Sequence, residues 1–228
     1  MEAKPDTYKE LLEIYSNMQL LPSIITEHEI NASPPAITNR VRLIDAERKL
    51  SIDLLSNRIV ASRQLTSPET SMDTDINDFC EEAKNLLKPI ITKYSWKSKR
   101  LALVVSGVFH DLSTDTLKRL TMNAISNKFI EDPENLEEWL IRTVKRYPLM
   151  NYKEDMLNVV INLGRSKLMN TVNKMEYDGF HVIFDINTIP ENQALRFTTD
   201  DIDTFIEQAK ALQKENEKRI EAWMDGGN

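Results

Sequence analysis

A strand and a long helix near the end of the chain constrain its fold more than any other feature. Residues 179–187 alternate between apolar and polar side chains, which is the period of a strand with one buried face. Residues 199–224 follow with apolar side chains at helical spacing. The apolar positions of the strand are Phe180, Val182, Phe184 and Ile186, and those of the helix include Ile202, Phe205, Ala209, Ile220 and Trp223. The pattern predicts a sheet covered by a helix.

Earlier segments extend the same architecture. We expect strands at 23–30, 38–44, 49–55 and 58–65, and a helix at 74–94. Short polar connections between the last three of these strands are typical of an antiparallel meander. Because strands follow one another locally and helices gather on one side, we predict an α+β fold. It consists of an antiparallel meander sheet covered by helices, with a long C-terminal helix.

We expect a single α+β domain over residues 1–228. A strand-strand-helix order recurs in the ranges 22–112 and 140–228, so two duplicated halves are the alternative organisation. The apolar run 99–109 has apolar residues on both faces, which predicts a central strand, packed under the helix 74–94.

One more helix is expected in the middle of the chain. Asp132 can cap a helix and Pro133 fits its first turn, so we predict a helix over 134–146.

The composition indicates a soluble globular protein. Charged residues make up 29% of the 228 and hydrophobic ones 41%, and the formal net charge is −7 at pH 7. That acidic balance does not favour non-specific attraction to a phosphate backbone. The longest apolar run is too short to cross a bilayer, the first residues do not resemble a signal peptide, and Cys80 is the only cysteine. We therefore predict a cytoplasmic protein with no membrane contact and no internal disulfide.

Three stretches give the chain a family resemblance. They are the meander 50–65, the helix 79–94 leading into 99–104, and residues 179–186 before the acidic start of the last helix. With them the chain resembles an uncharacterised, sporadically distributed bacterial protein family whose members are roughly this size. The resemblance implies a prokaryotic cytoplasmic protein from a mobile or anti-phage locus. It brings no established activity and no functional residues.

An enzymatic hypothesis has few residues to draw on. A hydrolase or nuclease would use His110, His181 and Asp185. Residues four apart on a regular strand are separated by about 13 Å, so His181 and Asp185 would not form a direct pair. Capping and the helix dipole account better than a metal site for the carboxylates that open the last helix, Asp200, Asp201 and Asp203. We expect no catalytic residue, no metal and no cofactor.

A second alternative is nucleic-acid binding by basic side chains on the sheet. If they face outward together, they could contact a phosphate backbone. The competing interpretation is that they are solvated charges at sheet edges, which discourage aggregation. The basic residues are Arg40, Arg42, Arg58, Arg63, Lys97, Lys99 and Arg100.

The end of the last helix suggests a contact with another chain. Residues 213–219 are almost entirely polar, which suggests that the helix leaves the globular body before Ile220, Trp223 and Met224. Trp and Met are common at interfaces, so we predict that these three bind a protein partner or a second copy. The leading hypothesis is thus a non-enzymatic protein-binding subunit or regulator in a bacterial operon, with anti-phage defence as its expected setting.

Overall fold

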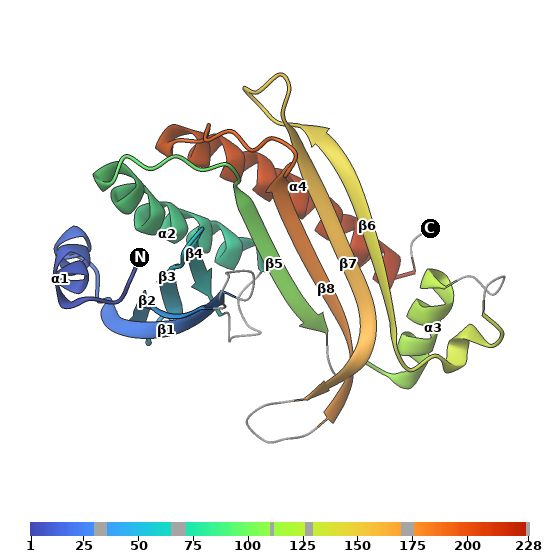
Figure 1. Ribbon diagram of the computed structural model, residues 1–228. Helices are drawn as coiled ribbons and strands as arrows, with labels where there is room; N and C mark the ends of the chain where they lie inside the picture. The colour runs from blue at the N-terminus through green and yellow to red at the C-terminus, as the bar shows by residue number, and fades with distance from the viewer. Residues whose placement is uncertain (30–35, 65–71, 110–111, 126–129, 170–175, 227–228) are drawn as a thin grey trace. The chain divides into compact units, whose positions relative to one another are not determined.

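The computed structural model divides the chain into two compact units. The first comprises Met1–Lys97 with Thr198–Asp203, and the second comprises Ser98–Phe197 with Thr204–Asn228. Each unit contains a four-stranded antiparallel sheet, which confirms the predicted α+β class with antiparallel sheets (Figure 1). The single-domain organisation stays a prediction. The structure describes residues 1–29, 36–64, 72–109, 112–125, 130–169 and 176–226.

The first unit is a meander covered by helices. Its strands lie in chain order, each paired antiparallel with the next. The strand positions predicted from the sequence are therefore confirmed to within a few residues. The elements are α1 (Pro5–Ile14), β1 (Leu21–Glu29), β2 (Ala36–Asp45), β3 (Leu50–Leu54), β4 (Ile59–Arg63) and α2 (Met72–Lys93).

The core of the first unit lies between its sheet and α2. Leu43 and Ile52 are cross-strand partners, and both pack in one buried cluster with Leu86 and Ile90 of the helix. Tyr15, at the end of α1, joins this cluster and donates its hydroxyl to the backbone carbonyl of Leu86. Burial raises the pKa of Tyr15, so the hydroxyl stays protonated and keeps this donor role.

The second unit places its last strand in the middle of the sheet. The strand order is β5-β8-β7-β6, all antiparallel. In Figure 1 the long helix α4 crosses behind the strands of this sheet. The elements are β5 (Ala102–Phe109), α3 (Thr114–Ala124), a short 3-10 turn (Pro133–Asn135), β6 (Trp139–Pro148), β7 (Met156–Met169), β8 (Glu176–Thr188) and α4 (Thr199–Met224).

The core of the second unit uses the alternating strand that the sequence predicted. Phe184 and Val182 of β8 are buried and pack against Ile220 of α4. At one end, the Phe180 ring lies 5.8 Å from that of Trp139 and 5.7 Å from that of Trp223, between ring centroids. Burial of aromatic and aliphatic side chains against one helix face is the main favourable term for this unit.

The predicted helix over 134–146 is wrong. Asp132-Pro133 opens only the 3-10 turn, and Trp139–Pro148 forms β6, paired with β7 along its whole length. The segment alternates, with Trp139 and Ile141 on one side, opposite Arg165 and Leu163 of β7, and Leu140 on the other side. This period of two, together with β-branched and aromatic residues, favours a strand over a helix despite the capping signal.

The apolar run before Phe109 does not form a central strand. β5 is at the edge of the sheet, where it pairs with β8. Its two apolar faces are not both buried, because Leu103 is 7% exposed whereas Val104 is 58% exposed. The helix expected to cover this strand, α2, instead packs its buried residues against the first sheet.

The helix α4 stays on the protein through its polar middle. Gln213 is 2% exposed and Asn216 is 7% exposed, so the expectation that this stretch leaves the globular body is wrong. Both amides keep hydrogen-bond partners on the helix: Gln213 donates to the carboxylate of Glu217, and Asn216 donates to the carbonyl of Leu212. A buried amide is tolerated when it is bonded in this way.

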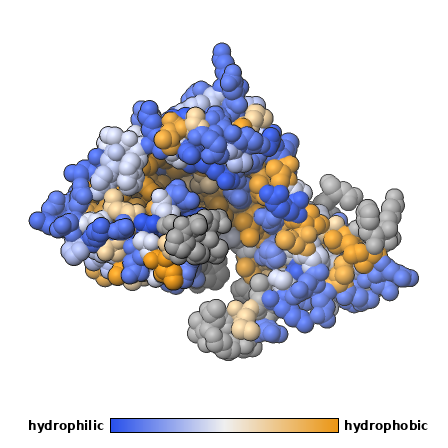
Figure 2. Space-filling model, viewed as in Figure 1, coloured by the Kyte–Doolittle hydropathy of each residue, from blue (hydrophilic) through white to orange (hydrophobic). Residues whose placement is uncertain are grey.

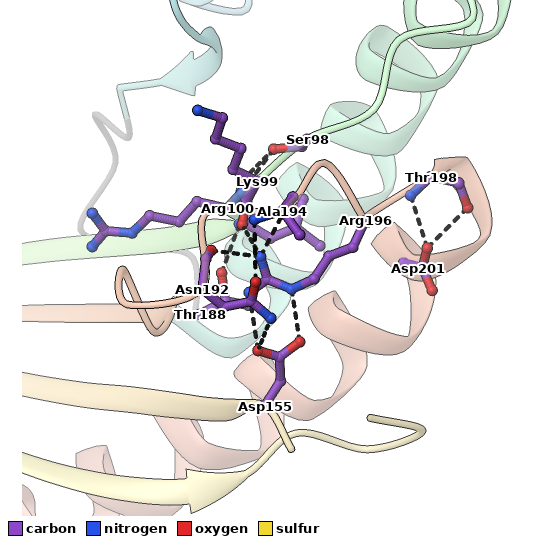
Figure 3. Close-up of polar contacts among 11 residues, drawn as sticks. Ser98, Lys99, Arg100, Asp155, Thr188, Asn192, Ala194, Arg196, Thr198 and Asp201 are labelled. Carbon is purple, nitrogen blue, oxygen red and sulfur yellow. Dashed lines mark hydrogen bonds and ion pairs between the residues drawn. The ribbon is translucent and has the colours of Figure 1, made fainter. Parts of the chain in front are cut away.

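A buried ion pair fixes the segment between β8 and α4. The Arg196 guanidinium binds both carboxylate oxygens of Asp155, at 2.7 and 3.1 Å, and also donates to the backbone carbonyl of Lys99 (Figure 3). Asn192 donates its amide to the same carboxylate. Asp155 precedes β7 and Lys99 precedes β5, so one side chain ties the starts of two strands to the segment that leads into α4.

The acidic start of α4 acts as a cap and an ion-pair partner. Asp201 accepts hydrogen bonds from the backbone N–H and the hydroxyl of Thr198, and Asp203 pairs with Lys88. These contacts support the capping interpretation of this carboxylate group. Among the residues that the structure describes, no group of three or more His, Cys, Asp and Glu is arranged to hold a metal ion.

Candidate protein-binding face

The second sheet has one face covered by α4 and one open face. Side chains alternate along each strand, so the residues between the core positions point away from α4. We call this outward side of β6, β7, β8 and β5 the open face. In Figure 2 hydrophobic side chains gather over part of this sheet, with hydrophilic ones among them.

Strand register arranges the open face in four rows. Each row crosses the strands in the order β6, β7, β8, β5. The first row is Arg146, Asn158, Asn187, Ala102; the second is Val144, Val160, Asp185, Val104; the third is Arg142, Asn162, Ile183, Ser106; and the fourth is Leu140, Gly164, His181, Val108.

Apolar side chains are concentrated in the second and fourth rows, and those on the edge strands are exposed. Leu140 is 63% exposed and Val144 47% on β6, and Val104 and Val108 of β5 are exposed to a similar extent. Outward positions of a one-sided antiparallel sheet are usually polar. Apolar side chains in matching rows on both edges form a patch of the kind found at interaction sites.

The first row is a chain of hydrogen bonds across the sheet. Arg146 donates to the side-chain oxygen of Asn158, and the Asn158 amide donates to Asn187. Asn187 in turn donates to the Asp185 carboxylate at 2.8 Å, while Arg146 also pairs with Glu191. Polar groups at this end of the face are thus satisfied within the chain, and they border the apolar rows.

The His181 ring lies over Gly164 in the fourth row. A Cβ on Gly164 would stand 2.6 Å from the ring carbon Cε1 of His181, so only glycine leaves room for the ring there. The ring nitrogen Nδ1 is 3.5 Å from the hydroxyl of Ser166. The ring therefore fills the space above Gly164.

The two residues of the enzymatic hypothesis that the structure describes, His181 and Asp185, are not brought together. His181 is in the fourth row and Asp185 in the second row of the same strand, about 13 Å apart at the usual rise. Asp185 is bonded to Asn187. His110 lies outside the described residues.

Three of the seven basic residues of the nucleic-acid hypothesis lie on strands of the first sheet, and they are divided between its two faces. Arg40 and Arg42 point away from the helices, paired with Glu27 and Asp53. The Asp53 carboxylate raises the pKa of Arg42.

Arg63 is on the helix-covered side, since it is the cross-strand partner of the core residue Leu50. It binds Glu82 of α2 at 2.8 Å. Carboxylates therefore already bind three of these guanidinium groups, which weakens the case for a phosphate surface. The other four residues of the predicted set are exposed: Arg58, Lys97, Lys99 and Arg100.

The residues predicted to bind a partner at the end of α4 contact their own sheet. Ile220 is 8% exposed, Met224 packs in the same cluster, and the ring of Trp223 lies against Phe180. Arg119 of α3 donates to the backbone carbonyl of Met224, which caps the helix end. A contact of Ile220, Trp223 and Met224 with another chain stays a prediction. The open face was missed from the sequence, although alternating apolar residues in β6 were a signal for it.

Comparison of the chain with protein-family models, curated proteins and solved structures found no match. In the part of the chain that the structure describes, no helix is long and apolar enough to span a membrane.

Proposed function

We propose that this protein functions by binding another protein through the open face of its second sheet. The observation that supports the proposal is the pair of apolar rows, with Val104, Val108, Leu140 and Val144 exposed on the edge strands. Burying such side chains against a partner removes apolar area from water, at roughly 25 cal/mol per Å². The polar first row would form part of the rim of the interface.

The face fits binding better than chemistry. Its only imidazole in the described residues, His181, lies over Gly164 and has Ser166 rather than a carboxylate beside it. The polar groups of the first row bond to one another instead of converging on a cavity. We therefore propose a non-enzymatic subunit or regulator. Its setting in a bacterial operon with an anti-phage role rests on the family resemblance of the sequence.

Copurification tests the proposal. The tagged full chain would be recovered from its native host as wild type, as Leu140→Asp, and as Ile37→Asp. Ile37 is 71% exposed on β2 of the first sheet, so it is a matched apolar-to-acid control. We expect a protein bound in stoichiometric amount, either another protein or a second copy carrying a different tag. Leu140→Asp should release it and Ile37→Asp should retain it.

Two outcomes would contradict the proposed function. One is that the wild type binds nothing. The other is that Leu140→Asp and Ile37→Asp retain the bound protein equally. Thermal unfolding of each variant serves as the folding control, since both substitutions are at exposed positions and should change stability little.

A further inference from the structure

We propose that the open face binds a second copy of this chain, face to face, about a two-fold axis parallel to the strands between β7 and β8. The inference rests on the proposed function, because it names the partner of the same face. The strand register determines which residues share a row, and therefore which residues of a second, identical face would lie opposite them.

Such an axis keeps every row opposite itself and exchanges the strands in pairs. β6 of one copy lies over β5 of the other, and β7 lies over β8. Val144 then meets Val104, and Leu140 meets Val108. Because a two-fold axis makes each contact twice, all four exposed apolar side chains of each copy leave water together.

The sizes of the facing side chains are complementary along the edges. Arg142 would lie over Ser106, and Arg146 over Ala102. Two sheets that pack face to face are about 10 Å apart, so a long side chain needs a short one opposite. The sequence of β5 supplies the short residues, and that of β6 supplies the long ones.

The charges of the face also balance. Arg146 is neutralised by Glu191 of its own chain. Arg142 is exposed, and in the two-fold arrangement it lies diagonally from the partner copy's Asp185, one row and one strand away. The two Asp185 carboxylates lie in the same row, one strand apart across the axis, and each Arg142 lies one row further from the partner copy's Asp185. Although the chain carries a net charge of −7, two guanidinium groups would therefore offset these two carboxylates at the centre of the interface.

The area is enough for a reversible dimer. Four strands about 4.8 Å apart and four rows about 6.8 Å apart give a face of roughly 19 by 27 Å. Each copy would thus cover roughly 500 Å², and about 1,000 Å² in total is the lower limit for a specific interface. We therefore expect a dimer that dissociates on dilution.

A different two-fold axis also pairs the apolar side chains but brings like charges together. An axis perpendicular to the strands, through the third row, would bring Val144 over Leu140 and Val104 over Val108. It would also place Arg142 opposite Arg142 of the other copy. Like charges in contact across an interface are unfavourable, so the axis parallel to the strands is preferred.

Sedimentation equilibrium of the purified full chain tests whether the partner is a second copy. We expect a monomer–dimer equilibrium in the wild type. Val144→Asp should raise the dimer dissociation constant at least about tenfold, a change of about 1.4 kcal/mol. Ile37→Asp in the first sheet should leave the constant unchanged.

Exchanging the charges tests the proposed contact between Arg142 and the partner copy's Asp185. Arg142→Glu and Asp185→Arg should each weaken the dimer. The double variant should recover most of the loss, because the pair is restored with its charges exchanged.

Cysteine cross-linking tests the orientation without altering a charge. Chains with Val144→Cys and with Val104→Cys would be mixed and treated with a short thiol-specific cross-linker. We expect many more covalent dimers in the mixture than with either chain alone. A mixture of Val144→Cys with Leu140→Cys should give few. Cys80 is buried at 1% exposure, and the wild type is the control for its reactivity.

Three results would overturn the inference. A chain that is monomeric at every concentration excludes the second copy. Cross-linking between positions 144 and 140 in preference to 144 and 104 excludes the proposed axis. If the chain alone is monomeric but Leu140→Asp releases a different protein in copurification, the inference fails and the proposed function stands.

Discussion

The outward faces of the two sheets carry different kinds of side chain. On the first sheet, Arg42 pairs with Asp53 on the neighbouring strand, and the hydroxyls of Ser51 and Ser62 are 2.9 Å apart. On the second sheet, the matching outward positions of the edge strands hold exposed valine and leucine, such as Val144. The first face therefore pairs its charged side chains within the chain and exposes one large apolar side chain, Leu21, on its edge strand, whereas the second exposes apolar side chains on both edge strands.

The contrast is informative because the two units are built alike. Each contains three strands in meander order followed by a helix: β2-β3-β4-α2 in the first and β6-β7-β8-α4 in the second. The fourth strand is added at opposite edges, β1 beside β2 and β5 beside β8. The strand-strand-helix repeat seen in the sequence thus has a structural counterpart, while duplication itself stays a prediction. Two units of like architecture therefore carry unlike outward faces.

The largest loss of stability is expected at the buried ion pair of the second unit, between Asp155 and Arg196. Asp155→Ala leaves the Arg196 guanidinium buried without its carboxylate and should lower the free energy of unfolding by about 3–5 kcal/mol. Urea denaturation measures the loss, and hydrogen exchange should show the starts of β5 and β7 opening first. Glu191→Ala, which breaks an exposed pair with Arg146, should cost about 0–1 kcal/mol. Equal losses in the two variants would show that the buried pair does not hold these strands.

A smaller loss in the free energy of unfolding should distinguish the outward face of the first sheet from the open face of the second. Arg42→Ala removes the partner of Asp53, which is 7% exposed, so we expect a loss of about 1.5–3 kcal/mol from a charged hydrogen bond. Arg142→Ala on the open face removes an exposed side chain and should change stability by no more than about 0.5 kcal/mol. Chemical denaturation of the monomer, at a concentration below dimer formation, measures both. A reversal of this order would contradict the view that only the first face depends on its own ion pairs.

The smallest loss of stability is expected at the turn between β2 and β3. The backbone N–H of Arg48, and then its guanidinium, lower the pKa of Asp45 by hydrogen bonding to the carboxylate. A lowered folded-state pKa stabilises the protein above the unfolded value of about 3.9, and this contribution is lost as the pH falls through the folded value. Asp45→Asn should therefore cost about 1 kcal/mol at pH 7 and less below about pH 4. Thermal unfolding across this pH range measures the difference, and a cost that does not change with pH would contradict it.

Local periodicity predicted more of the fold than of the candidate site. The alternating strand at Phe184, the helix at Ile220 and the meander of the first unit were all correct, because each pattern states which side of its own element is buried. The segment Trp139–Pro148 alternates too, but the capping signal of Asp132 and Pro133 just before it predicts a helix, and in the structure that signal opens only one short turn.

The sequence by itself determined the α+β class, most of the strands and helices, and the core face of the strand that contains Phe184. Only the tertiary structure decided that β5 lies at an edge, that α2 covers the first sheet, and that Val104 and Leu140 are exposed in matching rows. The physical reason is that periodicity is a local property, whereas strand pairing and the covering of a face join residues far apart in the chain. An apolar side chain has the same sequence signature whether a helix covers it or it is exposed on an open face.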